Sequence, residues 1–174
     1  MQDQNNLIVY CEFEDGKVAD VSLELLTKGR QLASQLGVKL EAVVIGDNLD
    51  GVENQLFPYG ADVVYKVADK RLYPYTSNPH AAVLINLFRE IKPQICLMGA
   101  TCIGRDLGPR VSSCLHSGLT ADCTSLVIGD HKDPKTGKDF YAVKDTSLTI
   151  EPGSFVTLLL SLIHISEPTR PRLI

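Results

Sequence analysis

Short apolar runs rich in β-branched residues alternate with segments of helical period, and this alternation constrains the fold more than any other feature of the sequence. The runs are predicted as strands at Leu7–Cys11, 40–45, 62–67 and 95–98. The segments between them are predicted as helices at Asp20–Leu36, 52–57 and 79–91, and Gly37 is expected to end the first. Continuous apolar strands separated by helices are typical of a parallel sheet that is covered on both faces. The predicted fold class is therefore α/β, with a doubly wound, mostly parallel open sheet.

A change of pattern after residue 125 predicts an antiparallel extension at the edge of this sheet. The segment 133–137 reads Asp-Pro-Lys-Thr-Gly, which is the composition of a turn. It separates two further apolar runs, at 124–128 and 140–143, which are predicted to pair as a hairpin.

The composition is that of a globular domain and excludes several kinds of partner. The chain has 174 residues, of which 44% are hydrophobic and 22% charged, so it suits one domain with a proper core. A net charge of -4 without a basic cluster excludes nucleic acid as a partner. The apolar run 155–165 is shorter than the roughly 20 residues that span a bilayer, so no membrane insertion is expected. The N-terminus lacks a signal-peptide pattern, and the protein is expected in the cytoplasm.

Side chains that perform acid–base or metal chemistry are scattered, so no catalytic residue and no metal site are predicted. The five cysteines lack Cys-x-x-Cys spacing, and the four histidines lie at no ligand spacing. Glu12, Glu14 and Asp15 follow the first strand and are interpreted as a solvated rim rather than an acid/base pair. The segment 73–75, Tyr-Pro-Tyr, is interpreted as a rigid turn, with a contact loop as the alternative.

The segment 99–126, GATCIGRDLGPRVSSCLHSGLTADCTSL, is the strongest candidate for function. It follows an apolar run and is expected at the carboxyl end of a strand, where open α/β sheets bind their ligands. The candidate cofactor-binding residues are Gly99, Ala100, Thr101, Gly104, Arg105 and Asp106. A helix N-terminus with a glycine-rich approach binds anions, so a phosphate-bearing cofactor is one interpretation. A purely structural turn and a contact across a subunit interface are the other two.

The same segment predicts a helix with defined ends. Asp106 is expected to cap its N-terminus, because a carboxylate suits the positive end of the helix dipole. Pro109 is expected in the first turn of the helix, where backbone N–H groups have no acceptor within the helix, so the missing N–H of proline costs no hydrogen bond there. Gly118 is expected to end the helix as a C-cap glycine.

The order of these residues closely resembles the signature of the alpha subunit of electron transfer flavoprotein: GAT, two residues, GRDL, a small residue, PR, and later GLTADCT. The resemblance implies a sheet of the adenine-nucleotide α-hydrolase type and an FAD-containing heterodimer with an electron transfer flavoprotein beta subunit. It implies an electron carrier rather than an enzyme, which takes electrons from dehydrogenases such as the acyl-CoA dehydrogenases of fatty acid β-oxidation. Most contacts to FAD belong to a separate C-terminal domain in that family, so this chain alone is not expected to hold FAD tightly.

The resemblance also divides the chain. It predicts the electron transfer flavoprotein alpha N-terminal domain over 1–143, whereas 144–174 departs from the family and the C-terminal FAD domain is expected to be absent. The last residues, 161–174, resemble translated cloning-vector sequence and are expected to contribute little to stability. The alternative function, from another class, is a nucleotide-binding or sensing module without redox chemistry. A reading frame that continues past Lys144 with Arg-Pro and a glycine-rich segment favours the flavoprotein.

Overall fold

The computed structural model describes residues 6–123, 126, 128–132, 139–143, 148–149 and 156–160. Their main sheet has six strands in the order β5-β4-β1-β6-β11-β7, and all of its neighbouring strands are parallel. The strands are β1 (Leu7–Cys11), β4 (Leu40–Gly46), β5 (Val63–Ala68), β6 (Ile95–Gly99), β7 (Gly118–Cys123) and β11 (Val156–Leu160). The four strands predicted from apolar runs are thus confirmed as β1, β4, β5 and β6.

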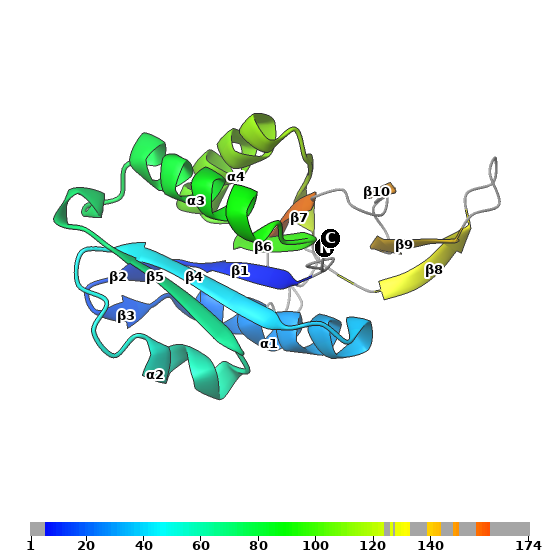
Figure 1. The fold of residues 1–174 in the computed structure, drawn as a ribbon, viewed down its shortest axis with the longest axis horizontal. Helices are drawn as coiled ribbons and strands as arrows, with labels where there is room; N and C mark the ends of the chain where they lie inside the picture. The colour runs from blue at the N-terminus through cyan, green and yellow to red at the C-terminus, as the bar shows by residue number, and fades with distance from the viewer. Residues whose placement is uncertain are drawn as a thin grey trace, which may run out of the picture.

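Helices cover both faces of this sheet, as a doubly wound fold requires (Figure 1). On one face lie α3 (Ser77–Ile91) and α4 (Cys102–Leu115), and on the other lies α1 (Asp20–Leu36). Short turns complete the connections: α2 (Glu53–Leu56), η1 (Phe57–Tyr59) and η2 (Lys70–Leu72). The helix α1 has the predicted bounds, because Gly37 adopts a φ of 69° and its N–H closes the last turn on Ala33.

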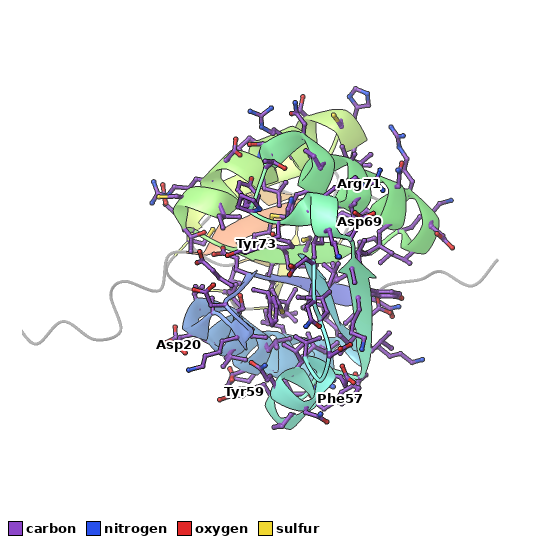
Figure 2. The ribbon with its side chains drawn as sticks, turned by 90° about the vertical axis from the view of Figure 1, so that its left-hand side faces the viewer. Asp20, Phe57, Tyr59, Asp69, Arg71 and Tyr73 are labelled. Carbon is purple, nitrogen blue, oxygen red and sulfur yellow. The ribbon has the colours of Figure 1, made fainter. Side chains whose placement is uncertain are left out.

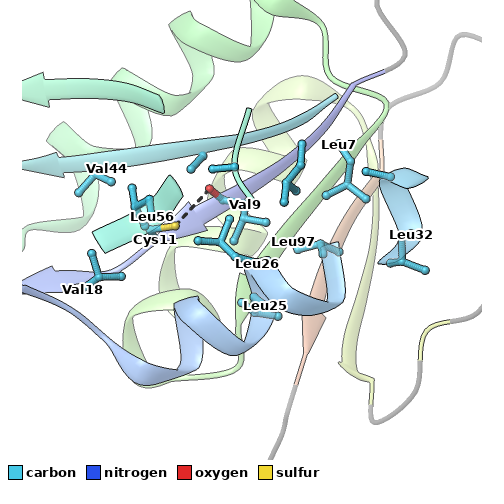
Figure 3. Close-up of a cluster of buried hydrophobic side chains, with 14 of the residues drawn as sticks. Leu7, Val9, Cys11, Val18, Leu25, Leu26, Leu32, Val44, Leu56 and Leu97 are labelled. Carbon is cyan, nitrogen blue, oxygen red and sulfur yellow. Dashed lines mark hydrogen bonds between the residues drawn. The ribbon is translucent and has the colours of Figure 1, made fainter. Parts of the chain in front are cut away.

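The core is divided by the sheet into two clusters, as the alternation of side chains along a buried strand requires. Leu7, Val9 and Cys11 of β1 pack towards α1 (Figure 3). Ile8 and Tyr10 of the same strand pack towards α3 and α4. Full burial of one such aliphatic side chain contributes about 1.5–3 kcal/mol, so a strand that is buried on both faces anchors the whole sheet.

Two small antiparallel sheets accompany the main one. The predicted hairpin is present as β8 (Ile128–Lys132) and β9 (Asp139–Val143), and β10 (Leu148–Thr149) pairs with β9. Residues 124, 125 and 127 of the predicted first strand lie outside the described residues, and the hairpin belongs to a separate three-stranded sheet rather than to the edge of the main one. The other sheet, β2 (Phe13–Glu14) with β3 (Lys17–Val18), was not predicted.

The ends of α4 differ from the prediction. Thr101 is the N-cap residue, so Asp106 lies inside the helix and does not cap it. Pro109 lies in the middle of α4, where its missing N–H leaves the carbonyl group of Arg105 without the usual helical donor, so its predicted place in the first turn was wrong. The helix ends at Leu115 rather than at Gly118, because His116 adopts a φ of 53° and the N–H of Ser117 bonds back to Ser112.

The strand β11 belongs to the segment 144–174, which was predicted to depart from the family. It lies between β6 and β7 and pairs with both. Residues 161–174 lie outside the described residues, so the expectation about them stays a prediction.

Candidate functional site

The six predicted site residues include the last residue of β6 and the residues that follow it, at the point where the sheet reverses its direction of growth. From β1 the chain adds β4 and β5 on one side and then crosses to β6 on the other side. The connection after β1 leads to α1 on one face, and the connection after β6 leads to α4 on the opposite face. Open α/β sheets commonly bind ligands at such a switch point, and the predicted segment lies there, whereas its role in binding stays a prediction.

The crevice is tightly packed at Gly99, the last residue of β6. A Cβ atom placed on Gly99 lies 3.2 Å from Cγ2 of Val21 and 3.3 Å from Oε1 of Glu12. These contacts explain why a glycine stands at this position: a larger residue would push α1 or the Glu12 carboxyl group away from β6.

Thr101 joins the start of α4 to the end of β1. Its Oγ1 accepts a hydrogen bond from the N–H of Gly104 at 3.0 Å, which is the capping bond of the helix. The same hydroxyl donates to Oε1 of Glu12 at 2.5 Å. The Glu12 carboxyl group therefore lies beside the N-terminal end of α4, where the helix dipole favours negative charge.

Glu12 was wrongly interpreted as part of a solvated rim. Its exposure is 9%, whereas Glu14 and Asp15 are exposed as predicted. Burial raises the pKa of Glu12, the Thr101 hydrogen bond opposes that rise, and the nearby charge of Glu14 adds to it. The sequence did hold one indication that Glu12 is buried, because Glu12 directly follows a strand of five apolar residues.

Arg105 links the loop to the neighbouring strand β7. Its Nε donates to the carbonyl oxygen of Ala100 at 3.1 Å, and its Nη2 lies 2.7 Å from Oδ1 of Asp122. The two side chains are 54% and 57% exposed, so this ion pair lies at the surface. Asp122 adopts a φ of 56°, next to the point where the pairing of β7 with β11 shifts register.

Asp106 ties α4 to the start of α3. Its carboxylate accepts hydrogen bonds from the hydroxyls of Ser77 and Tyr75 and from Nε of Arg110. These three donors, with Ser77 contributing most, lower the pKa of Asp106 to about 2. Asp106 thus serves as a joint between two helices, a role that no local pattern in the sequence indicates.

A cleft of ≈ 340 Å³ opens at the same edge but on the β4 side of β1. Its walls are the β2–β3 hairpin, the start of α1, the end of β4 and the segment 72–75, with His80 and Ile103 behind them. None of the six predicted residues lines it, whereas Glu12 does. The structure therefore brings the predicted residues together on one side of Glu12 and leaves an open cavity on the other.

Two further findings concern the described part of the chain. None of its helices combines the length and the apolar character needed to cross a bilayer. No three His, Cys, Asp or Glu side chains within these residues come together in a way that suits a metal ion.

The family model and the curated relatives that match this chain point to the same family. The family model described as "Electron transfer flavoprotein domain" matches residues 7–158. The electron transfer flavoprotein subunit alpha of Clostridium acetobutylicum is 38% identical over 95% of this chain and 53% of its own length. The protein FixB of Rhizobium meliloti is 46% identical over 72% of this chain and 36% of its own. The acryloyl-CoA reductase electron transfer subunit beta of Anaerotignum propionicum is 44% identical over 71% of this chain and 34% of its own. The chain thus spans about a third to a half of the length of these relatives.

Proposed function

Because the chain belongs to the electron transfer flavoprotein family, we propose that it works as part of an alpha subunit that pairs with an electron transfer flavoprotein beta subunit and carries electrons through FAD. The observation that supports this most strongly is the uninterrupted segment 99–124, which carries the family's residues inside a match that extends over 7–158. In this proposal the donor is a dehydrogenase of the acyl-CoA dehydrogenase type. The protein is a cytoplasmic carrier rather than an enzyme, since flavin supplies the redox chemistry when it is bound.

The residues of the segment fit one edge of a flavin site rather than a complete one. The N-terminal end of α4 already faces the Glu12 carboxyl group, which opposes a pyrophosphate at the same place. Arg105 is different, because its guanidinium is cationic and about half exposed. We therefore assign Arg105 the contact with flavin or with the partner subunit, and give Gly99, Ala100, Thr101, Gly104 and Asp106 the role of holding it in position.

This division of roles leads to two expectations for the isolated chain. Residues 1–174 alone should not retain FAD, because the pyrophosphate, adenine and isoalloxazine groups need contacts beyond one loop edge. Mixed with the cognate beta subunit, the chain should form a complex of the summed mass in light scattering. A chain that stays monomeric with the beta subunit present, or that purifies with stoichiometric flavin by itself, contradicts the proposal.

Arg105→Ala tests the assigned role in the complete subunit assembled with its beta subunit. A surface ion pair contributes less than about 1 kcal/mol to stability, so the variant should unfold nearly as the wild type does. Loss of a charged hydrogen bond to flavin or partner should weaken that association by about tenfold or more. The control is Arg71→Ala, which removes a highly exposed arginine paired with Asp69. Equal flavin content and partner affinity in both variants would assign Arg105 a structural role only.

The alternative, a nucleotide-sensing module without redox chemistry, is not favoured by the comparisons, which name electron transfer proteins. The domain boundary at residue 143 and the departure of 144–174 from the family remain part of the proposal. Sequencing of the gene beyond the codon for Lys144 tests them directly, since a native stop there would favour a separate module.

A further inference from the structure

The cleft on the β4 side of Glu12 has rigid walls. On one side, the β2–β3 hairpin is fixed by Gln55 of α2, whose Oε1 accepts from the N–H of Val18 at 3.0 Å and whose Nε2 donates to the carbonyl of Gly16 at 3.1 Å. On the other side, the hydroxyl of Tyr73 reaches the tip of this hairpin at Asp15, at 3.4 Å. The space between them is a preformed cavity of the size that small ligands occupy.

Figure 2 looks onto this edge of the molecule, with Tyr73 near the middle and Asp20 towards α1. Apolar side chains of the cavity include Ile45 at the end of β4, Leu72 of η2 and Ile103 of α4. Tyr75 and His80 add a pair of tilted rings whose centroids are 4.8 Å apart. These walls suit a ligand with a flat apolar body.

Two side chains that line the cavity and are themselves about nine-tenths or more buried, Glu12 and His80, keep a hydrogen-bond acceptor that no described residue uses. Glu12 bonds to Thr101 through Oε1, and its other carboxylate oxygen has no hydrogen-bond partner among the described residues. His80 is 3% exposed, and its Nδ1 donates to the carbonyl of Thr76 at 3.0 Å. Burial lowers the pKa of His80, so the ring is neutral and its Nε2 is an acceptor without a partner in the described part of the chain.

The charges around the cavity have one predominant sign. Its described lining contains three carboxylates, Glu12, Glu14 and Asp20, against the single ammonium group of Lys17. A carboxylate or phosphate ligand would face this excess of negative charge, and the two unused acceptors would have nothing to accept from it. A cationic ligand with N–H donors satisfies both requirements.

We propose that this cleft binds a small organic cation, a protonated amine carried on a flat aromatic body. The ammonium group lies against the free carboxylate oxygen of Glu12 and the acceptor nitrogen of His80. The aromatic body packs between the apolar strand ends and the tyrosine rings, where a cation near an aromatic face gains further attraction. This site is separate from the electron-transfer function proposed above, because none of the six loop residues lines it.

Tryptamine is a suitable probe, because the chain contains no tryptophan and indole fluorescence therefore reports the ligand alone. The anisotropy of tryptamine is measured as residues 1–174 are added, without flavin or beta subunit. Indole-3-propionate, which has the same ring and chain length but a carboxylate, is the matched probe of opposite charge. Tryptamine is expected to bind saturably, and indole-3-propionate is expected not to bind.

Two variants test the residues. Glu12→Gln keeps an acceptor for Thr101 but removes the charge, and should weaken tryptamine binding by about tenfold or more. The matched control is Glu53→Gln, which changes an exposed glutamate outside the cavity and should leave binding unchanged. Ala19→Leu fills the cavity from the start of α1, where Ala19 caps the helix without a side-chain bond, and should abolish binding.

Thermal unfolding of each variant shows whether it is folded. If Glu12→Gln does not fold, the binding of tryptamine to Ala19→Leu tests the proposal instead. The proposal is overturned if neither probe binds, if both bind equally well, or if tryptamine binds the folded Ala19→Leu variant as it binds the wild type.

Discussion

The hydrogen bond between Thr101 and Glu12 allows the change in the free energy of unfolding to be predicted for the variant Thr101→Val. Valine has nearly the same shape as threonine, but it cannot accept from the N–H of Gly104 or donate to Oε1 of Glu12. Loss of an N-cap residue costs about 0.5–2 kcal/mol. Loss of a hydrogen bond to a charged group costs about 1.5–3 kcal/mol. The cost is expected to be smaller here, because Glu12 lines the open cleft, where water can replace the lost bond.

The two effects together predict that Thr101→Val lowers the free energy of unfolding by about 2 kcal/mol. In a domain of this size that corresponds to a fall in melting temperature of about 4–8 °C. Urea unfolding followed by far-ultraviolet circular dichroism measures the change, and an unchanged slope shows that the unfolded state is comparable. Thr101→Ser is the control, because serine keeps the hydroxyl and loses only a methyl group.

Comparison of the two variants separates the effect of losing the hydroxyl group from the effect of losing a methyl group in the packing. Thr101→Ser is expected to stay within about 0.5 kcal/mol of the wild type, which is the usual range for a change without a named structural defect. If Thr101→Val is as stable as Thr101→Ser, the hydroxyl does not join β1 to α4 and the assignment of Glu12 to the crevice is wrong.

Two further substitutions test the core. Glu41 is buried beside Asn6, and its Oε2 has no hydrogen-bond partner among the described residues. Burial raises the pKa of Glu41 more than the hydrogen bonds from Tyr65 and Asn6 lower it, so the folded state holds this proton more tightly. Stability therefore falls as pH rises from the unfolded value near 4.5 through the folded pKa. Glu41→Gln should remove this fall and raise neutral-pH stability by about 1 kcal/mol; urea titrations at several pH values would refute it by an unchanged pH slope. Gly60→Ala should cost about 1–2 kcal/mol because of its φ of 93°, and more because the new Cβ would lie 2.8 Å from Cδ of Arg30. Gly51 has a φ of 73°, and a Cβ there meets only Nδ2 of Asn54 at 3.7 Å, an ordinary contact, so Gly51→Ala should cost only the backbone part; equal urea midpoints would contradict this.

Four of the six strands of the main sheet, β1, β4, β5 and β6, could be predicted because their determinants are local, whereas β7 and β11 were not predicted. The strand β1 is a run of five buried residues, and Gly37 is a stop signal that the structure uses as such. The β2–β3 hairpin could not be predicted in the same way. Its strands have two residues each, and Gln55, which holds the hairpin, lies 37 residues away from Val18.

The place of the candidate loop in the fold could be predicted from the sequence, but its internal contacts could not. The segment after β6 was predicted at the carboxyl edge, and the structure places all six residues there. Asp106 and Thr101 both have side chains that can cap a helix, and the sequence does not say at which residue the helix begins. The partner of Thr101 is Glu12, 89 residues earlier in the chain, so only the order of the strands brings the two together.

Glu12 connects the two halves of this edge. One carboxylate oxygen accepts from Thr101 at the start of α4, and the other faces the cleft on the β4 side of β1. A cation bound in the cleft stabilises the charged form of Glu12, which is the form that accepts most strongly from the Thr101 hydroxyl. Because such coupling is reciprocal, anything that fixes the start of α4 also favours the cation.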